Sequence, residues 1–111
     1  MNLLVNNLLP APLKARFAKY PLYAQDGKGI KAKVIAKYFT GRTATWLATE
    51  GEPDGDDFIF FGYVTLNGID WEWGYFSLTE MEELNKLYGF TVIERELYTD
   101  PEEYTVEELI K

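Results

Sequence analysis

The sequence predicts an α+β fold: an antiparallel meander sheet of four to five strands with helices packed on it. Three observations favour this class. Apolar and polar residues alternate with period two through the middle of the chain. Short turn signals, of which Asn67-Gly68 is the strongest, separate these runs. Apolar residues at helical spacing come before and after them. We expect residues 1–111 to form one globular domain.

The first expected element is an N-terminal helix that two prolines introduce, since proline is tolerated in a first turn. Its apolar stripe, at spacing i, i+4 and i+7, is Leu13, Phe17 and Tyr20. Pro21 ends the helix because it disfavours helical backbone at the residue before it. Residues 25–29 are then expected to form a flexible loop.

Strands are expected at residues 33–40, 43–50, 58–66 and 70–76, with a further strand at 90–97. In the second strand, Ala44, Trp46 and Ala48 share one face, and Thr45, Leu47 and Thr49 share the other. Residues 51–56 are expected to form a long acidic turn. The third strand is apolar on both faces, which predicts a central strand that is covered on both sides.

Two helices are expected in the second half of the chain. Ser77 and Glu80 form a capping-box pattern, with Phe76 and Met81 placed as a hydrophobic staple. The expected buried stripe of this helix is Leu78, Met81, Leu84 and Tyr88, and Gly89 suits its C-terminal cap. Thr105 and Glu108 form a second capping box that opens a short C-terminal helix.

The composition excludes several chemistries. The chain has 111 residues, no histidine, no cysteine and a single serine, Ser77. Imidazole or thiol catalysis, disulfides and zinc sites built on His or Cys are therefore impossible. Ser77 is expected to cap a helix, and no metal site or cofactor is expected. The apolar start is too short for a secretory signal and no window resembles a membrane span, so we expect a cytoplasmic protein.

The formal charge of −7 is unevenly divided along the chain. Residues 1–42 hold eight basic side chains and one acidic side chain, a charge of +7, whereas residues 43–111 hold 3 basic and 17 acidic ones, a charge of −14. Such asymmetry can mark a nucleic-acid or protein-binding surface, although opposite charges in a small domain also tend to intermix in space.

Two groups of residues could carry function. An acid–base hydrolase would need paired carboxylates, here on strands with tryptophans nearby. The candidate carboxylates are Glu50, Glu72, Glu94 and Glu96. The basic side chains of the segment Lys28–Arg42, near Tyr38, Phe39 and Trp46, could hold single-stranded nucleic acid. A third reading is that the acidic half of the chain binds a basic surface on another protein.

The chain also resembles a known family. The residues that carry the resemblance are Pro21-Leu22-Tyr23, Lys37-Tyr38-Phe39-Thr40, Thr45-Trp46, Thr49-Glu50, Phe61-Gly62-Tyr63-Val64, Glu72 to Leu78 and Ile93-Glu94-Arg95-Glu96. In this order they resemble a small bacterial domain-of-unknown-function family that carries the number 2958. The resemblance implies an accessory role on plasmids, phages or integrative elements, such as countering restriction or CRISPR systems. It also implies that Glu72 and residues 94–96 form either a polar site or a structural ion-pair cluster.

The leading hypothesis is a non-enzymatic interaction protein of a mobile genetic element that inhibits a host defence protein. A nucleic-acid-binding accessory protein is the alternative, and a carboxylate-based hydrolase is third. The candidate interaction residues are Lys28, Lys31, Lys33, Lys37, Arg42, Trp46, Glu50, Glu72, Trp73, Glu94 and Arg95.

Overall fold

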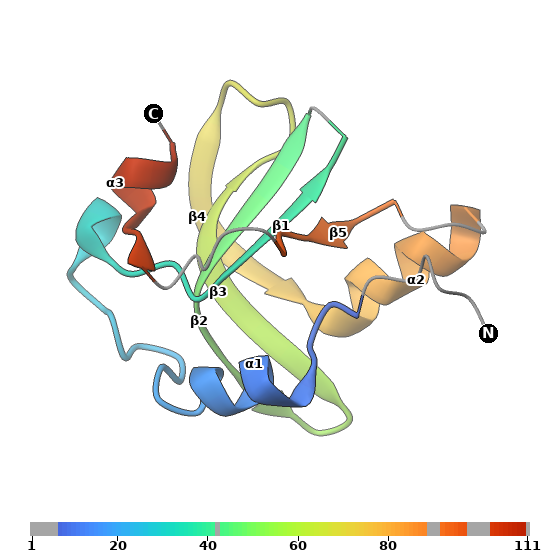
Figure 1. Cartoon of the computed structure of the whole chain (residues 1–111), viewed down its shortest axis with the longest axis horizontal. Coiled ribbons are helices and arrows are strands. Elements are labelled where there is room, and N and C mark those ends of the chain that lie inside the picture. The colour runs from blue at the N-terminus through green and yellow to red at the C-terminus, as the bar shows by residue number, and fades with distance from the viewer. Residues whose placement is uncertain (1–6, 42, 89–91, 98–102, 111) are drawn as a thin grey trace.

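The computed structural model describes residues 7–41, 43–88, 92–97 and 103–110. A five-stranded antiparallel sheet forms the centre, with the strands in the order β4-β3-β2-β1-β5 (Figure 1). The strands are β1 (Ala36–Thr40), β2 (Ala44–Asp54), β3 (Asp57–Thr65), β4 (Trp71–Ser77) and β5 (Glu94–Arg95). The helices are α1 (Ala11–Phe17), the short 3-10 helix η1 (Gly29–Lys31), α2 (Leu78–Tyr88) and α3 (Val106–Leu109). The predicted α+β meander is therefore confirmed.

One face of the sheet, which we call the helix-packed face, carries Tyr38, Phe60 and Phe76 and is covered by α1 and α2. Leu13 and Phe17 from α1 and Met81 from α2 pack against these rings in one buried cluster. Phe17 meets Phe60 edge to face, with ring centroids 5.4 Å apart. The Tyr38 hydroxyl donates to the carbonyl oxygen of Leu8 at 2.6 Å, so this buried polar group is satisfied.

The opposite face carries Phe61, Tyr63, Trp71, Trp73 and Tyr75, and we call it the aromatic face. Only one part of it is covered, where Val34, Leu47 and Val106 form a second buried cluster beneath α3. η1 and α3 lie side by side at this flank of the sheet (Figure 1). The remainder of the aromatic face, over β3 and β4, has exposed rings.

The expectation of a long acidic turn at residues 51–56 is wrong. β2 continues to Asp54, and a two-residue turn of Gly55 and Asp56 leads directly into β3. Gly55 has φ +60°, a left-handed conformation that glycine adopts without strain. Glu52 and Pro53 pair with Ile59 and Phe58 in the sheet, so pairing with β3 overrides the low strand propensity of this segment.

Several element boundaries also differ from the prediction. α1 ends at Phe17. Tyr20, the last residue of the predicted apolar stripe, therefore lies beyond the helix, in the turns that follow it. β1 begins at Ala36, although the preceding Val34 and Ile35 are buried and hydrogen-bonded to Tyr104 and Ala48. β5 comprises two residues, and residues 89–91 lie outside the described part of the chain, as does the expected cap Gly89.

The two predicted helix caps are found. The Ser77 hydroxyl accepts the Glu80 N–H at 3.1 Å, and Thr105 and Glu108 form a complete capping box. Met81 is buried as expected, whereas Leu84 is 42% exposed and does not belong to the buried stripe. None of the described helices has the length and apolarity that a membrane crossing requires.

Candidate functional site: an aromatic cleft

The aromatic face carries a continuous row of five neighbouring rings, which extends from the second buried cluster to the uncovered part of the face. The strands β3 and β4 pair in antiparallel register, which brings side chains from both strands into one row. Neighbouring ring centroids are 5.3, 4.6, 5.7 and 5.0 Å apart along the order Trp71, Tyr63, Trp73, Phe61 and Tyr75. Tyr75 is 56% exposed and Trp73 is 38% exposed, so this end of the row is open to a ligand.

A β-bulge in β2 determines which charged side chain reaches this face. The pairing of β2 with β3 shifts by one residue between Ala48 and Glu50, so that Thr49 is the extra residue. With regular alternation Glu50 would share the helix-packed face with Ala48. After the bulge it pairs with Phe61 instead and lies on the aromatic face.

The Glu50 carboxylate holds the loop that follows α1. Its two oxygens accept the N–H groups of Tyr23 and Gln25, each at 2.7 Å. Glu52, two residues further along β2, accepts the N–H of Leu22 at 2.9 Å. Charge-assisted hydrogen bonds of this kind are stronger than neutral ones. Glu50 is 4% exposed and is therefore a buried carboxylate whose oxygens are satisfied by the loop backbone.

The Gln25 side chain fixes the same loop to the sheet. Its amide nitrogen donates to the carbonyl oxygens of Lys33 and Thr49, both at 2.8 Å, and its amide oxygen accepts the Lys33 N–H at 2.7 Å. The side chain thereby bridges the backbone at Lys33 and the backbone of β2 at Thr49. Gln25 is buried, so the prediction of a flexible loop at residues 25–29 is wrong at its first residue.

Tyr23 lies at the rim of the site in an unusual conformation. Its φ of +76° is the one positive value among the described residues other than glycine. A bulky residue adopts this conformation only when its surroundings enforce it, and such residues concentrate at functional sites. The ring is 70% exposed, and its hydroxyl accepts a long hydrogen bond of 3.5 Å from the Tyr75 hydroxyl.

Between this loop and the aromatic row lies a cleft of about 430 Å³. This volume is within the range of small-ligand sites. The cleft is lined by Tyr23, Gln25, Asp26, Gly27, Gly29, Ala32, Thr49, Glu50, Phe61, Trp73 and Tyr75.

The cleft is electrically negative. Among the described residues, its lining contains the carboxylates of Asp26 and Glu50 and no lysine or arginine. The hydrogen bond with Tyr23 raises the pKa of the Tyr75 hydroxyl above its ordinary value, and the negative charges of Glu50 and Asp26 raise the pKa further. A cationic or polar ligand therefore suits the site better than an anion.

Among the described residues, two of the candidate interaction residues line the cleft, Glu50 and Trp73. Trp46 and Glu72 belong to the same cross-strand row as Tyr38 and therefore lie on the helix-packed face. Lys37 is on the aromatic face but belongs to β1, two strands away from the row of rings. Arg42 lies outside the described residues.

The structure does not assemble Glu50, Glu72 and Glu94 into the carboxylate pair that a hydrolase would need. Glu72 is on β4 and Glu94 is on β5, which form opposite edges of the sheet. Glu50 is in neither edge strand, and both of its oxygens already accept backbone hydrogen bonds. The implied joint site of Glu72 with residues 94–96 is wrong for the same topological reason. Arg95 donates from Nε to the carbonyl oxygen of Asn7 at 3.0 Å.

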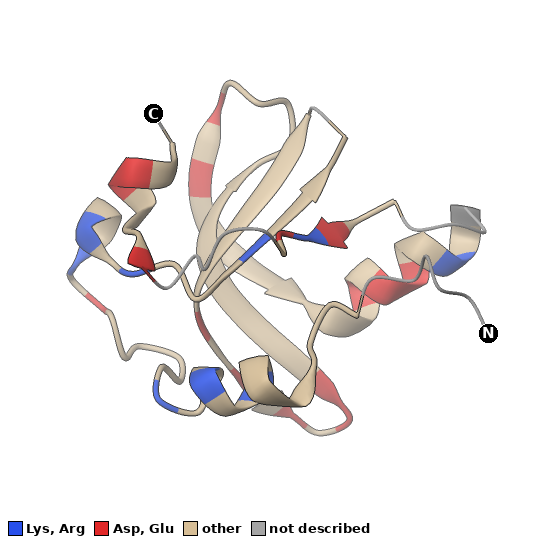
Figure 2. Cartoon of the chain, viewed as in Figure 1, with Lys and Arg blue, Asp and Glu red and all other residues tan. Residues whose placement is uncertain are grey.

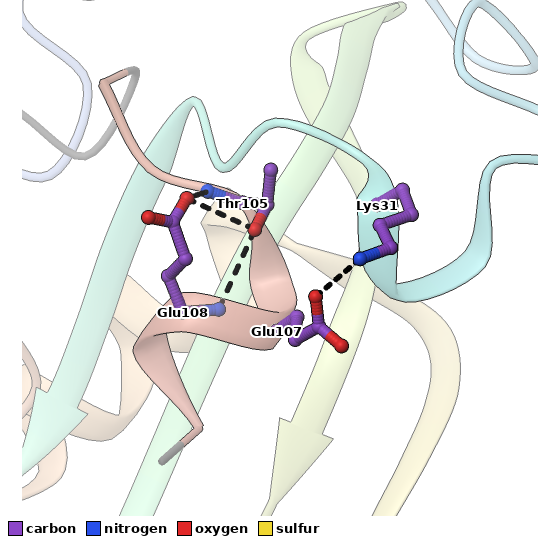
Figure 3. Close-up of polar contacts among 4 residues, drawn as sticks. All are labelled: Lys31, Thr105, Glu107 and Glu108. Carbon is purple, nitrogen blue, oxygen red and sulfur yellow. Dashed lines mark hydrogen bonds and ion pairs between the residues drawn. The ribbon is translucent and has the colours of Figure 1, made fainter.

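The basic segment and the acidic remainder intermix in space (Figure 2). Lys31 in η1 donates to the Glu107 carboxylate of α3, and beside this pair Thr105 and Glu108 form their capping box (Figure 3). This ion pair raises the pKa of Lys31 through its hydrogen bond to Glu107. Lys33 joins the same flank through a bridge between its backbone and that of Thr105, and Lys28 precedes η1 on the exposed loop.

Sequence reasoning missed most of the cleft. Its unrecognised members come from the loop after α1 and from β3 and β4: Tyr23, Gln25, Asp26, Phe61 and Tyr75. The alternation of Trp71, Trp73 and Tyr75 along the fourth strand was a signal for one shared face. The loop residues gave no comparable signal, because long-range hydrogen bonds to β2 position them.

Comparisons with known proteins agree with the resemblance found in the sequence. The comparison with curated proteins gave no match, and neither did the comparison with solved structures. A family model, described as "Protein of unknown function (DUF2958)", matches residues 8–107 and therefore nearly the whole chain. The matched region contains every residue that lines the cleft. The chain therefore belongs to the DUF2958 family of proteins of unknown function.

Proposed function

We propose that this protein is a non-enzymatic binding module that takes part of a protein partner into the aromatic cleft. The observation that carries the proposal is the pair of exposed rings of Trp73 and Tyr75, which line the cleft together with the half-buried Phe61 and the exposed Tyr23. Aromatic side chains concentrate in the energetically dominant centres of protein interfaces because they bury a large area at low conformational cost.

The rigid construction of the cleft supports a binding role. The loop that carries Tyr23 is held by Glu50, Glu52 and Gln25 through hydrogen bonds of 2.7 to 2.9 Å. A preorganised site loses less conformational entropy when it binds. The same bonds argue against a catalytic role for Glu50, because both of its carboxylate oxygens already accept backbone N–H groups.

The charges of the described residues favour a protein partner over nucleic acid. The cleft lining contains two carboxylates, which repel phosphates, and Lys31 is paired with Glu107. The family resemblance implies a mobile-element protein that counters host defence. We therefore propose that binding through the cleft inhibits a host defence protein. A restriction or CRISPR effector would then be the partner.

The proposal is tested by affinity purification from a bacterial lysate, with and without nuclease treatment, on three immobilised proteins. The wild type is compared with Trp73→Leu/Tyr75→Ser, which removes the exposed rings, and with Glu72→Gln on the other face of the same strand. We expect a protein that the wild type and Glu72→Gln retain and the cleft variant loses. Retention that disappears with nuclease treatment would support nucleic-acid binding, and equal retention by all three proteins would place the interface elsewhere.

A further inference from the structure

We infer that the cleft binds a cationic side chain, specifically an arginine guanidinium, presented by the partner. This inference rests on the proposed binding function and names the chemistry that the cleft recognises. It is carried by the juxtaposition of exposed aromatic rings with two carboxylates in one lining, in which the described part of the chain places no basic residue.

The rings provide a surface for stacking a planar cation. Trp73 and Phe61 are nearly parallel, with an interplanar angle of 11° and ring centroids 5.7 Å apart. Tyr75 is tilted by 58° against Phe61, with ring centroids 5.0 Å apart, and together with Trp73 it supplies the exposed rings of the cleft. A guanidinium is planar and weakly hydrated, and it stacks on aromatic faces through cation–π attraction.

The carboxylates give the cleft its preference for positive charge. Glu50 is buried with its charge directed at the loop backbone, so it contributes a fixed negative potential. Asp26 is exposed at the rim, on the loop that opposes the aromatic row. A carboxylate in that position can accept the parallel N–H groups of a guanidinium.

Tyr23 lines the cleft beside Tyr75. Its left-handed backbone, held by Glu50, brings its hydroxyl to 3.5 Å from that of Tyr75. Rings from two elements that are distant in sequence therefore border the cleft. A cleft of about 430 Å³ has room for an arginine side chain.

The test compares two small probes that have nearly the same shape and differ in charge. N-acetyl-arginine methylamide carries a guanidinium, and N-acetyl-citrulline methylamide carries a neutral urea in its place. Binding is followed by NMR through the indole N–H signals of the three tryptophans. Trp46 lies on the helix-packed face and serves as an internal control.

We expect the arginine probe to shift the Trp73 signal and leave that of Trp46 unchanged, with an affinity about fivefold higher than that of the citrulline probe. Asp26→Asn should reduce this preference, and Glu72→Gln should preserve it. Binding followed through the Tyr75 ring signals should be lost in Trp73→Leu. Equal affinity for the two probes, or the absence of any shift at Trp73, would overturn the inference.

Failure of this inference is distinguishable from failure of the proposed function. If the two probes bind alike while the cleft variant still loses its protein partner, the cleft binds a neutral group and the binding function stands. If the arginine probe is preferred while all immobilised proteins retain the same partner, the cation site is present but the protein interface lies elsewhere.

Discussion

Glu50 holds Tyr23 in a left-handed backbone conformation: its carboxylate accepts the Tyr23 N–H at 2.7 Å, and Tyr23 has φ +76°. The second oxygen of Glu50 accepts the N–H of Gln25, also at 2.7 Å. One buried side chain on β2 therefore shapes a loop that lies more than 20 residues earlier in the chain. The aromatic cleft depends on this contact.

Replacing Glu50 with glutamine should lower the free energy of unfolding by about 1–3 kcal/mol. The amide keeps one acceptor oxygen and adds a donor, so one of the two backbone N–H groups loses its partner. Urea denaturation measures the effect, with Glu72→Gln as the control at an exposed position on β4. A loss in Glu50→Gln no larger than that of the control would contradict the role assigned to Glu50.

Gln25→Ala should also destabilise the protein, by about 3 kcal/mol, since it leaves buried backbone groups of Lys33 and Thr49 unpaired. Gln25→Glu should be comparably harmful at neutral pH, because a carboxylate cannot donate to the two carbonyl oxygens. Hydrogen exchange of the Tyr23 and Lys33 amides provides the local readout. Protection that is unchanged in both variants would show that the loop is held without Gln25.

Gly62 and Gly74 form a matched pair in adjacent strands. A Cβ on Gly62 would lie 1.9 Å from the carbonyl oxygen of Leu47, whereas a Cβ on Gly74 would meet no atom within 4 Å. Gly62→Ala should therefore cost more than about 3 kcal/mol or prevent folding, and Gly74→Ala should change stability by less than about 1 kcal/mol. Circular dichroism and thermal unfolding of both variants check this contrast, and equal behaviour would contradict the close strand approach at the bulge.

Asp57 should make stability depend on pH in the acidic range. Its carboxylate accepts the Thr79 N–H at 3.0 Å, at the start of α2, and this hydrogen bond lowers its pKa below the ordinary value of 3.8. A depressed folded-state pKa gives stability that is present above the unfolded-state pKa and is lost as the pH falls through the folded-state pKa. Unfolding curves of the wild type and Asp57→Asn should therefore differ most above about pH 4 and converge in stronger acid. A difference in the free energy of unfolding that stays constant at every pH would show that the ionised Asp57 carboxylate is not its origin.

The capping box of α3 should contribute more than the ion pair beside it (Figure 3). Thr105→Ala removes the side chain that accepts the Glu108 N–H and should cost about 1 kcal/mol. Lys31→Ala removes an exposed pair with Glu107, for which we expect little change because solvent screens it. Chemical denaturation at low and high salt separates the two effects. A larger, salt-sensitive loss in Lys31→Ala would reverse this order.

Local signals predicted much of the fold. The Asn67-Gly68 turn lies between β3 and β4, with Gly68 at φ +80°, and both helix caps form where the sequence placed them. These features depend on neighbours within a few residues, which a sequence contains directly. Where long-range pairing decided the outcome, as in the extension of β2 to Asp54, the prediction was wrong.

The candidate site was recovered only in part. Trp73 and Glu50 were among the expected interaction residues, but their companions Trp46 and Glu72 lie across the sheet from them. One bulged residue in β2 is responsible for the position of Glu50, because a shift of one residue moves a side chain to the opposite face. Regular alternation read from the sequence cannot indicate such a shift.

The sequence by itself determined the fold class, the exclusion of His and Cys chemistry, the helix caps and the family. Only the tertiary structure decided that Glu50 reaches the aromatic face, that Gln25 fixes a loop expected to be flexible, and that the described basic and acidic side chains intermix. The physical reason is the range of the interactions. Caps and tight turns depend on adjacent residues, whereas the cleft depends on hydrogen bonds and strand pairing between segments that meet only when the chain folds.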